Sequence, residues 1–344
     1  MGRRECTYSM FRYERISMRG PQGPQDAAQV TGYDGRLRDL VLPGELDGLP
    51  VRSIAGHAFE HRRDLCSASL PGNLKTLRAF AFYGCTSLTS MELYNTTDDY
   101  YDGVIRQCPS LRLITVHCVR ADDFVIVRDM LSDVDGTLSF RLLTPQGEIR
   151  LTFPDYLNEA KEDTMARAIH FSIEGAGMAY RECVGKKKLD LAAYDRLLGR
   201  LTDYDFDVAA RIAFGRLACP VGLQERFEKG YEVFLKENDR KALTGLIGGG
   251  AAGAGDANAR RGSGSYAAPA GGGDAGRMSA EREKERRESL NLLIDRQLIG
   301  RDALEEGLAL ASANGETEIC SLLMDYRSRA FPAGTLQTFS LDWL

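Results

Sequence analysis

The histidines and cysteines of this 344-residue chain are the residues whose side chains could bind a metal ion or act as nucleophiles. Of its four histidines, His57, His61, His117 and His170, only the first two lie close together in the sequence, four residues apart. Neither belongs to an HExxH motif and no third ligand follows at a zinc-site spacing, so the histidines predict no metal centre. The cysteines include no CxxC pair, which excludes a zinc knuckle and a redox motif; they stand at positions 6, 66, 85, 108, 118, 183, 219 and 320.

One short string has a more specific resemblance to an enzyme motif. Residues 133–138, Asp-Val-Asp-Gly-Thr-Leu, resemble the first motif of haloacid dehalogenase-type phosphohydrolases. The resemblance implies that Asp133 would attack phosphorus, that Asp135 would act as acid and base, and that Mg²⁺ would neutralise the phosphate charge. That family needs an apolar strand directly before the first aspartate, whereas Asp129-Met130-Leu131-Ser132 stands there. We therefore predict a hairpin turn in which Asp-Gly supplies a positive φ, and a Mg-dependent phosphohydrolase remains an alternative.

A glycine-rich stretch near residue 250 gives no cofactor site. Residues 248–253 fit the pattern GxGxxG, but they lie in low-complexity sequence without the strand, turn and helix that such a motif needs. The surrounding stretch is rich in glycine and alanine and has almost no large apolar residue, so it cannot bury enough surface to fold. We predict a disordered linker over 248–278, and no cofactor, metal or small-molecule substrate.

A sequence motif repeats in the first third of the chain, and it predicts the strands that would position any functional side chain there. The pattern is Leu-x-x-apolar-x-apolar, and it occurs at Leu37-Leu40-Leu42, Leu65-Ala68-Leu70, Leu88-Met91-Leu93 and Leu111-Ile114-Val116. The last three copies are 23 residues apart, and the first lies 28 residues before the second. A period of roughly 20–29 residues with this motif is typical of leucine-rich repeats. In such a solenoid each repeat contributes a short strand, and neighbouring repeats bury a common core.

Alternation along these strands separates a core from an outer face. The predicted repeat core consists of Leu37, Leu40, Leu42, Leu65, Leu70, Leu88, Met91, Leu93, Leu111, Ile114 and Val116, together with Phe59, Phe82 and Ile105. The intervening residues point outward on the concave sheet, and we predict that they bind a protein partner: Asp39, Val41, Ser67, Ser69, Ser90, Glu92, Leu113 and Thr115.

The repeat region resembles the BspA-type bacterial leucine-rich repeats. The matching sequences are LVLPGELDGLPVRSIAGHAF at 40–59 and LPGNLKTLRAFAFYGCTSL at 70–88. They share a strand, a proline, a short turn, an Ala-Phe pair and, in the second, a Gly-Cys before the next leucine; the third repeat has Tyr94 in place of the proline. The resemblance implies a right-handed coil of short parallel strands. Because many members of that family are surface proteins, a cell-surface adhesin is a second alternative.

The rest of the chain predicts an α+β protein in which the short solenoid is followed by a small β cap and an α-helical, ankyrin-like domain. We expect strands at 124–127, 138–143 and 149–153, and helices at about 158–170, 190–202, 207–218 and 221–240. The predicted domains are an N-terminal cap (1–36), leucine-rich repeats (37–121), a small antiparallel β cap (122–157), an α-helical domain (158–247), the linker (248–278), ankyrin-like helical pairs (279–330) and a tail (331–344).

The last helical block resembles ankyrin-type helical pairing. An alanine-rich segment at 302–313 is followed by Asn314-Gly315 and by a Glu-Ile-x-x-Leu-Leu segment at 318–323. The Thr-Pro-Leu-His tetrapeptide of that family is missing. Residues 230–246 supply a candidate earlier partner helix, which would make the linker an insertion between helices.

Composition and charge exclude several classes of function. The chain is 43% apolar and 27% charged with a net charge of −5, so it lacks the basic excess of a nucleic-acid-binding protein. No stretch approaches the roughly 18 apolar residues of a membrane-spanning helix, and the N-terminal sequence has no apolar core of a signal peptide. We predict a cytoplasmic, bacterial, non-catalytic scaffold or adaptor that binds one or more unidentified proteins.

Overall fold

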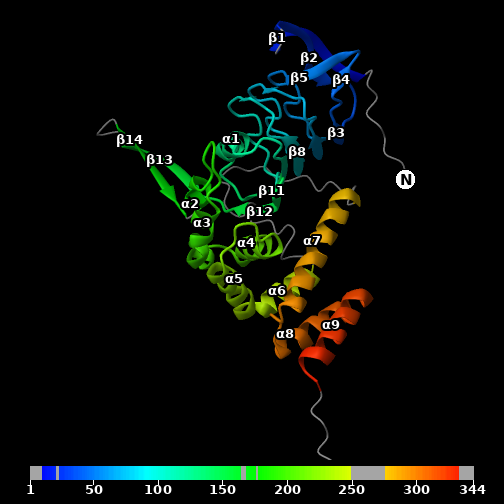
Figure 1. Ribbon diagram of the computed structural model, residues 1–344, viewed down its shortest axis with the longest axis vertical. Coiled ribbons are helices and arrows are strands. Elements are labelled where there is room, and N and C mark those ends of the chain that lie inside the picture. Colours follow the sequence, from blue (N-terminus) through cyan, green and yellow to red (C-terminus); the bar gives the residue numbers. More distant parts are fainter. Residues whose placement is uncertain (1–9, 21–22, 164–167, 176, 249–275, 333–344) are drawn as a thin grey trace, which may run out of the picture. The chain divides into compact units, whose positions relative to one another are not determined.

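The computed structural model describes residues 10–20, 23–163, 168–175, 177–248 and 276–332 (Figure 1). The chain divides into two compact units, and the boundary falls between Glu228 and Lys229. Most of the predicted linker, residues 249–275, and most of the predicted tail, residues 333–344, lie outside the described residues.

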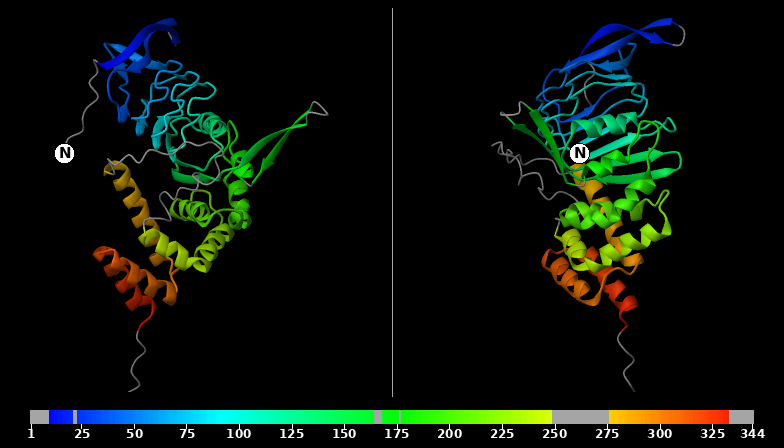
Figure 2. Two further views of the ribbon diagram at one scale, coloured as in Figure 1. Left: turned by 180° about the vertical axis from the view of Figure 1, so that it is seen from behind. Right: turned by 90° about the vertical axis from the view of Figure 1, so that its left-hand side faces the viewer.

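The first unit contains a β-solenoid whose turns each place one strand in a parallel sheet (Figures 1 and 2). Five parallel strands lie side by side in chain order: β3 (Asp39–Val41), β6 (Ser67–Ser69), β8 (Ser90–Tyr94), β10 (Leu113–His117) and β11 (Leu138–Thr144). A sixth strand, β12 (Gly147–Phe153), pairs antiparallel with β11 at the end of the sheet.

A second sheet forms another wall of the same solenoid. It contains β1 (Phe11–Gly20), β2 (Gly23–Tyr33), β4 (Glu45–Leu46), β5 (Leu49–Ile54), β7 (Thr76–Leu77) and β9 (Asp99–Tyr100). The first two strands form an antiparallel hairpin, and β2 then pairs parallel with β5. The described part of the predicted N-terminal cap, β1 and β2, therefore extends this sheet beyond β5.

The interior of the solenoid consists of repeated side chains stacked from one turn to the next. None of the fourteen predicted core residues is more than 3% exposed. The rings of Phe59 and Phe82 stack with their centroids 5.1 Å apart, one full repeat from each other. One repeat alone could not bury these groups, so stacking of neighbours is what removes them from water.

The strand predicted at 124–127 is wrong, because residues 125–127 begin a helix. Helix α1 spans Val125–Asp133, and the Asp123 carboxylate accepts the Val125 N–H at 3.3 Å. Ile126, Val127, Met130 and Leu131 are buried, which is the spacing of one helical face. A short apolar run such as Phe-Val-Ile-Val fits a buried strand and a buried helix equally well, so its period alone could not decide.

The predicted antiparallel cap is not a separate sheet. Strand β11 continues the solenoid sheet because it pairs parallel with β10, with Ile114 opposite Phe140. The hairpin turn predicted at Asp133–Thr137 is also wrong, since that segment joins the end of α1 to the start of β11. The helix therefore replaces the convex part of an ordinary repeat.

The helical prediction for 158–170 is wrong as well. Strands β13 (Leu157–Asp163) and β14 (Ala168–Glu174) form an antiparallel two-stranded ribbon there. Residues such as Glu159, Ala160 and Lys161 have high helix propensity, but the alternating Ile169-x-Phe171-x-Ile173 favours a strand. Pairing with that strand overrides the local propensity of its partner.

Helices complete the first unit, and one of them contacts the outer edge of β12, the last strand of the main sheet. They are α2 (Gly177–Glu182), α3 (Leu191–Arg196), a 3₁₀ helix (Leu197–Asp203) and α4 (Phe206–Ala218). The Tyr194 hydroxyl donates to the Thr152 carbonyl at 2.6 Å and accepts the Thr152 N–H at 3.0 Å, which satisfies the outer edge of β12. Next to it, Arg216 and Asp195 form a fully buried two-pronged ion pair.

The second unit consists of helices. Helix α5 (Glu225–Glu237) crosses the unit boundary, and the predicted helix 221–240 ends earlier than expected because α6 (Asp239–Ile247) starts a new axis after Asn238. The others are α7 (Gly276–Asp295), α8 (Arg301–Ala313) and α9 (Thr317–Ala330). Within the described residues, none of the helices has both the length and the apolar character needed to cross a bilayer.

Helix pairing in this unit follows the sequence pattern. Gly315, with φ +72°, lies in the turn between α8 and α9. Leu243 and Ile247 of α6 pack on Gly307 of α8, where a Cβ atom would come within 2.5 Å of Leu243. Helix α6 is thus a partner of the last helices, and the predicted linker lies between α6 and α7. The region is helical, while its likeness to ankyrin repeats stays a prediction.

Candidate binding surface on the parallel sheet

The eight residues predicted to bind a partner all lie on strands of the parallel sheet, at positions that alternate with the core. In β3 the burial pattern is exposed, buried, exposed, so Asp39 and Val41 flank the buried Leu40. In β8 and β10 the outward residues are half-buried and alternate with fully buried ones. We call the outward side of this sheet the ladder face; it is made of the outward residues of β3, β6, β8, β10, β11 and β12.

Strand pairing aligns these residues in rows across the sheet. The first row runs through Asp39, Ser67, Ser90 and Leu113, and the second through Val41, Ser69, Glu92 and Thr115. Because Cα partners on neighbouring strands lie only about 5 Å apart, each row is a continuous line of side chains. The structure thus brings all eight predicted residues together on one surface.

Both rows extend over two strands that the sequence pattern did not assign to this sheet. By register, Ser139 and Thr152 continue the first row and Arg141 and Arg150 continue the second. Thr152 is only 5% exposed, so the accessible part of the first row ends at Ser139. A signal for them exists: Leu138-x-Phe140-x-Leu142 repeats the apolar alternation of the earlier strands. Paired residues of β10 and β11 are 26 positions apart instead of 23, so a search for the 23-residue period does not identify β11 as a repeat strand.

Polar contacts between neighbouring strands fix the side chains of the first half of the ladder face. The Ser67 hydroxyl donates to the Asp39 carboxylate at 2.5 Å. His117 Nε2 lies 2.7 Å from a carboxylate oxygen of Glu92. The ring of His117 also stacks on Tyr94, with ring centroids 4.4 Å apart. These contacts hold the side chains in one arrangement before any partner arrives.

Two arginines and a glutamate lie together at the far end of the ladder face. Arg141 and Arg150 both donate to Glu148, through Nε at 2.9 Å and 2.6 Å respectively. Partial burial alone would raise the pKa of Glu148, but hydrogen bonds from the two guanidinium groups outweigh it and hold the pKa below its usual value. Two arginines thus lie at this end of the face around one carboxylate, whereas the acidic residues Asp39 and Glu92 lie on β3 and β8.

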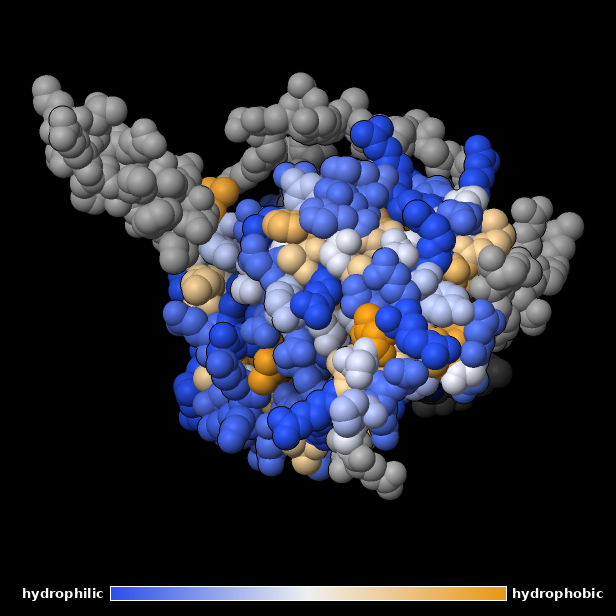
Figure 3. Space-filling model, turned by 90° about the horizontal axis from the view of Figure 1, so that it is seen from above, coloured by the Kyte–Doolittle hydropathy of each residue, from blue (hydrophilic) through white to orange (hydrophobic). Residues whose placement is uncertain are grey.

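The surface is mainly polar. On the side of the molecule drawn in Figure 3, apolar residues are scattered among hydrophilic ones. On the ladder face itself Val41, 53% exposed, is the large apolar residue that stands out most. The remaining outward positions are mostly serine, threonine and charged residues. Such a surface suits a hydrogen-bonded, hydrated contact better than an apolar one.

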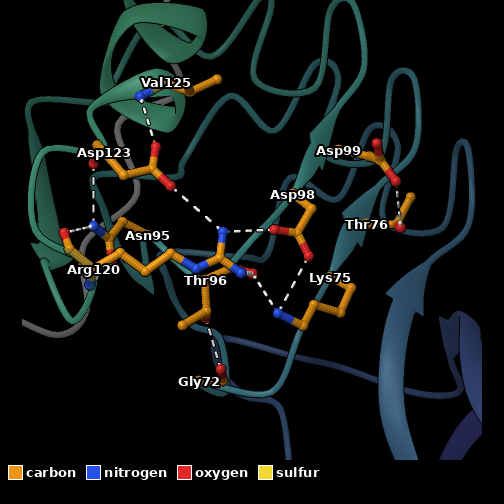
Figure 4. Close-up of polar contacts among 10 residues, drawn as sticks. All are labelled: Gly72, Lys75, Thr76, Asn95, Thr96, Asp98, Asp99, Arg120, Asp123 and Val125. Carbon is orange, nitrogen blue, oxygen red and sulfur yellow. Dashed lines mark hydrogen bonds and ion pairs between the residues drawn. The ribbon is translucent and has the colours of Figure 1, made fainter. Parts of the chain in front are cut away.

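Charged side chains from the loops that follow these strands form a separate network, shown in Figure 4. Lys75 pairs with Asp98 at 3.2 Å, and Arg120 pairs with Asp98 at 2.6 Å and with Asp123 at 3.4 Å. The Asn95 amide donates to the backbone carbonyls of Arg120 and Asp123. Partial burial raises the pKa of Asp98, but Arg120 and Lys75 outweigh it and lower the pKa overall. This network joins three successive turns of the solenoid.

The two aspartates of the phosphohydrolase-like string have different environments. The Asp133 side chain is 2% exposed, and it accepts hydrogen bonds from the Tyr100 hydroxyl at 2.6 Å and from the Gly103 N–H at 2.9 Å. Asp135 is exposed. In the described part of the chain, no group of three or more His, Cys, Asp and Glu side chains could hold a metal ion. The geometry gives Asp133 a structural role.

Comparisons with known proteins concern the solenoid. Residues 43–120 match the sequence model of a family described as "BspA type Leucine rich repeat region (6 copies)". No curated protein matches the chain. A T. pallidum leucine rich repeat protein of solved structure is 23% identical, over 31% of this chain and 69% of the other, with a TM-score of 0.21. A leucine-rich repeat protein from Bacteroides ovatus ATCC 8483 is 12% identical, over 40% of this chain and 52% of the other, with a TM-score of 0.19.

Proposed function

Given that residues 43–120 are a BspA-type leucine-rich-repeat region, we propose that this protein is a non-catalytic binding protein whose ladder face holds a protein partner. The observation that carries the proposal is the alignment of outward side chains in two rows, one across five strands of the sheet and one across all six. Repeat proteins commonly use such extended, preformed surfaces for binding.

Preorganisation supports binding by this face. Its backbone is fixed in a hydrogen-bonded sheet, and contacts such as Ser67 with Asp39 and His117 with Glu92 already hold the side chains. Little conformational entropy is then lost on association. Most of the outward side chains are polar, so we expect a hydrated interface of modest affinity.

The charge pattern indicates what the partner presents. Asp39 and Glu92 lie on the half formed by β3 to β8, and Arg141 and Arg150 lie on the half formed by β11 and β12. A partner with basic groups opposite the first half and acidic groups opposite the second would be complementary in charge. Such complementarity mainly sets orientation and rate of association.

The finer role depends on where the protein is found. A cytoplasmic scaffold and a surface adhesin would use the same ladder face, and fractionation of the source bacterium with an antibody to the chain would separate the two. We favour the cytoplasmic scaffold. The phosphohydrolase alternative has no geometric support, because the Asp133 carboxylate is buried and already bonded.

The direct test is capture of partners from a native bacterial lysate. The wild-type chain is compared with a triple variant, Ser67→Arg, Ser69→Arg and Ser90→Arg, which places three long cations on the ladder face. The matched control is Thr86→Arg, Ser87→Arg and Ser110→Arg, three half-buried hydroxyl residues outside the strands. We expect a stoichiometric partner with the wild type and the control but not with the ladder-face variant. A partner retained by all three proteins would refute the use of this face.

A further inference from the structure

The ribbon formed by β13 and β14 is a sheet of two strands only (Figure 1). Its register runs from Leu157 opposite Glu174 to Asp163 opposite Ala168. Among the described strands, none pairs with the outer edge of either member. A ribbon of two strands is marginally stable in water, and both of its outer edges can accept another strand.

The two edges of the ribbon differ in charge. Strand β13, Leu-Asn-Glu-Ala-Lys-Glu-Asp, has four charged residues in seven. Strand β14, Ala-Ile-His-Phe-Ser-Ile-Glu, has one carboxylate, at its last position. Charged residues along an edge strand prevent its pairing with other chains, and their absence leaves an edge open to pairing. The β14 edge is therefore the one suited to accept a strand.

The residues of β14 also alternate in type. Ile169, Phe171 and Ile173 occupy every second position, so they belong to one face of the ribbon. Ala160 stands opposite Phe171 in the register and shares that face. A strand added beside β14 would be placed next to this apolar row.

We propose that β14 pairs antiparallel with β14 of a second copy of this chain, about a two-fold axis at Phe171, to form a four-stranded sheet. In that register Ile169 stands opposite Ile173 of the other copy, and Phe171 opposite its own equivalent. His170 stands opposite Ser172, and Glu174 opposite Ala168. No like charges face each other, and apolar and aromatic residues meet in pairs that stabilise sheets.

A second copy fits better than an unrelated chain because the strand is complementary to itself. An isologous interface needs each residue to suit the residue that the two-fold axis places opposite it, and β14 meets this condition at every position. A contact of one strand edge is small compared with a stable dimer interface. The dimer is therefore weak and its population depends on protein concentration. The proposal does not depend on the ladder face.

Sedimentation velocity of the full chain, over a dilution series from about 1 to 100 µM, tests the proposal. We expect the wild type to shift from monomer to dimer across this range. Phe171→Lys places two cations at the two-fold axis and is expected to stay monomeric throughout. Glu159→Lys, on the charged strand, is the control and is expected to dimerise like the wild type. A wild type that is monomeric at every concentration, or a dimer unaffected by Phe171→Lys, overturns the proposal.

Disulfide trapping tests the register. With copper phenanthroline as oxidant, Phe171→Cys is expected to form a covalent dimer, because each new thiol stands opposite its own equivalent. Ile169→Cys, whose neighbour across the axis is Ile173, is expected to give no more covalent dimer than wild type treated in the same way. Equal trapping of both variants contradicts the two-fold axis at Phe171. The triple ladder-face variant serves as a folded control that still dimerises.

Discussion

Two aspartate side chains, Asp64 and Asp133, accept hydrogen bonds from a neighbouring turn of the solenoid. Asp133, at the end of α1, accepts the Tyr100 hydroxyl and the N–H groups of Gly103 and Ile105, all from the third repeat. Asp64 does the same near the N-terminal end, where it accepts the Leu37 N–H at 2.7 Å. These residues are charged and lie beside a core, but every contact that is seen for them is internal to the fold.

Replacement of Asp133 by asparagine tests this structural role. The asparagine side chain has an NH₂ group in place of one carboxylate oxygen, and this group would face the donors Tyr100 O–H, Gly103 N–H and Ile105 N–H. At least one buried hydrogen bond to a charged acceptor is therefore lost. Such bonds contribute about 1.5–3 kcal/mol, and we expect Asp133→Asn to lower the free energy of unfolding by about 2 kcal/mol in urea titrations. The exposed Asp135 supplies the control, with Asp135→Asn expected within about 0.5 kcal/mol of wild type. Equal effects of both changes would contradict the assignment.

At the scale of the element, the end of the main sheet depends on one hydroxyl group. Among the described strands, none lies beside the outer edge of β12, and the Tyr194 hydroxyl bonds both the N–H and the carbonyl of Thr152. Burial raises the pKa of Tyr194 well above its ordinary value, so the hydroxyl stays protonated and can donate. The Tyr194 side chain thus satisfies the backbone groups of Thr152 that a strand of a further repeat would otherwise bond.

Tyr194→Phe removes that hydroxyl and leaves two buried backbone groups without a partner. The expected loss is about 2–3 kcal/mol, since each unsatisfied buried group costs about 1–3 kcal/mol. Hydrogen exchange of the Thr152 amide is expected to accelerate. Tyr180→Phe is the matched comparison, because the Tyr180 hydroxyl makes one bond, to the Leu197 carbonyl at 3.2 Å, and should cost about 1 kcal/mol. If Tyr180→Phe were the more damaging change, the role given to Tyr194 would be wrong.

The elements that could be predicted from sequence are those encoded by a period. The 23-residue spacing and the alternation along each strand were enough to place Leu88, Met91 and their equivalents inside and Ser90 and Glu92 outside. Helix α1 was missed because its apolar run has no distinctive period. Strand β11 was assigned to the wrong sheet because its pairing with β10 spans that helix. Arg141 and Arg150, at the far end of the ladder face, were missed for the same reason.

The ribbon of β13 and β14 shows a different limit. Local propensity in Glu159-Ala160-Lys161-Glu162 favours a helix. This segment is a strand because it pairs with β14, in which the partner of Glu159 is Ser172, thirteen residues further along the chain. The strand structure of β13 is indicated by the alternating apolar residues of β14 and not by the sequence of β13 itself. A prediction made segment by segment cannot recover it.

At the scale of the whole molecule, three paired carboxyl groups link stability to pH. Partial burial alone would raise the pKa of Asp64, Asp98 and Glu148, but hydrogen bonds from neighbouring cationic groups and, for Asp64, the Leu37 N–H outweigh it, so each pKa lies below its ordinary value. The unfolded chain therefore takes up protons first as the pH falls. This contribution to stability is complete above the unfolded pKa of about 4 and is lost as the pH drops through the lower folded values.

Thermal unfolding between pH 7 and pH 2.5 measures this linkage. We expect the melting temperature to be nearly constant above about pH 5 and to fall progressively below about pH 4. Asp98→Asn removes one of the three groups, so its melting temperature should start lower at pH 7 and fall less steeply in acid. Parallel curves for the two proteins would mean that Asp98 and its partners Arg120 and Lys75 contribute nothing to the acid transition.

The division of the chain into two units implies that damage to one core need not reach the other. Leu88 is fully buried in the first unit, and Leu88→Asp would place an unpaired charge there. The free-energy cost of burying that charge exceeds the net stability of most folded domains. Helices α8 and α9 rest on their own core, which includes Leu304, Leu323 and Tyr326. In hydrogen exchange of the full chain, we expect the repeat strands of Leu88→Asp to lose protection while α8 and α9 keep it. Leu113→Asp, on the outward side of β10, should leave both units protected. Loss of protection in α8 and α9 together with the strands would show instead that the two units fold as one.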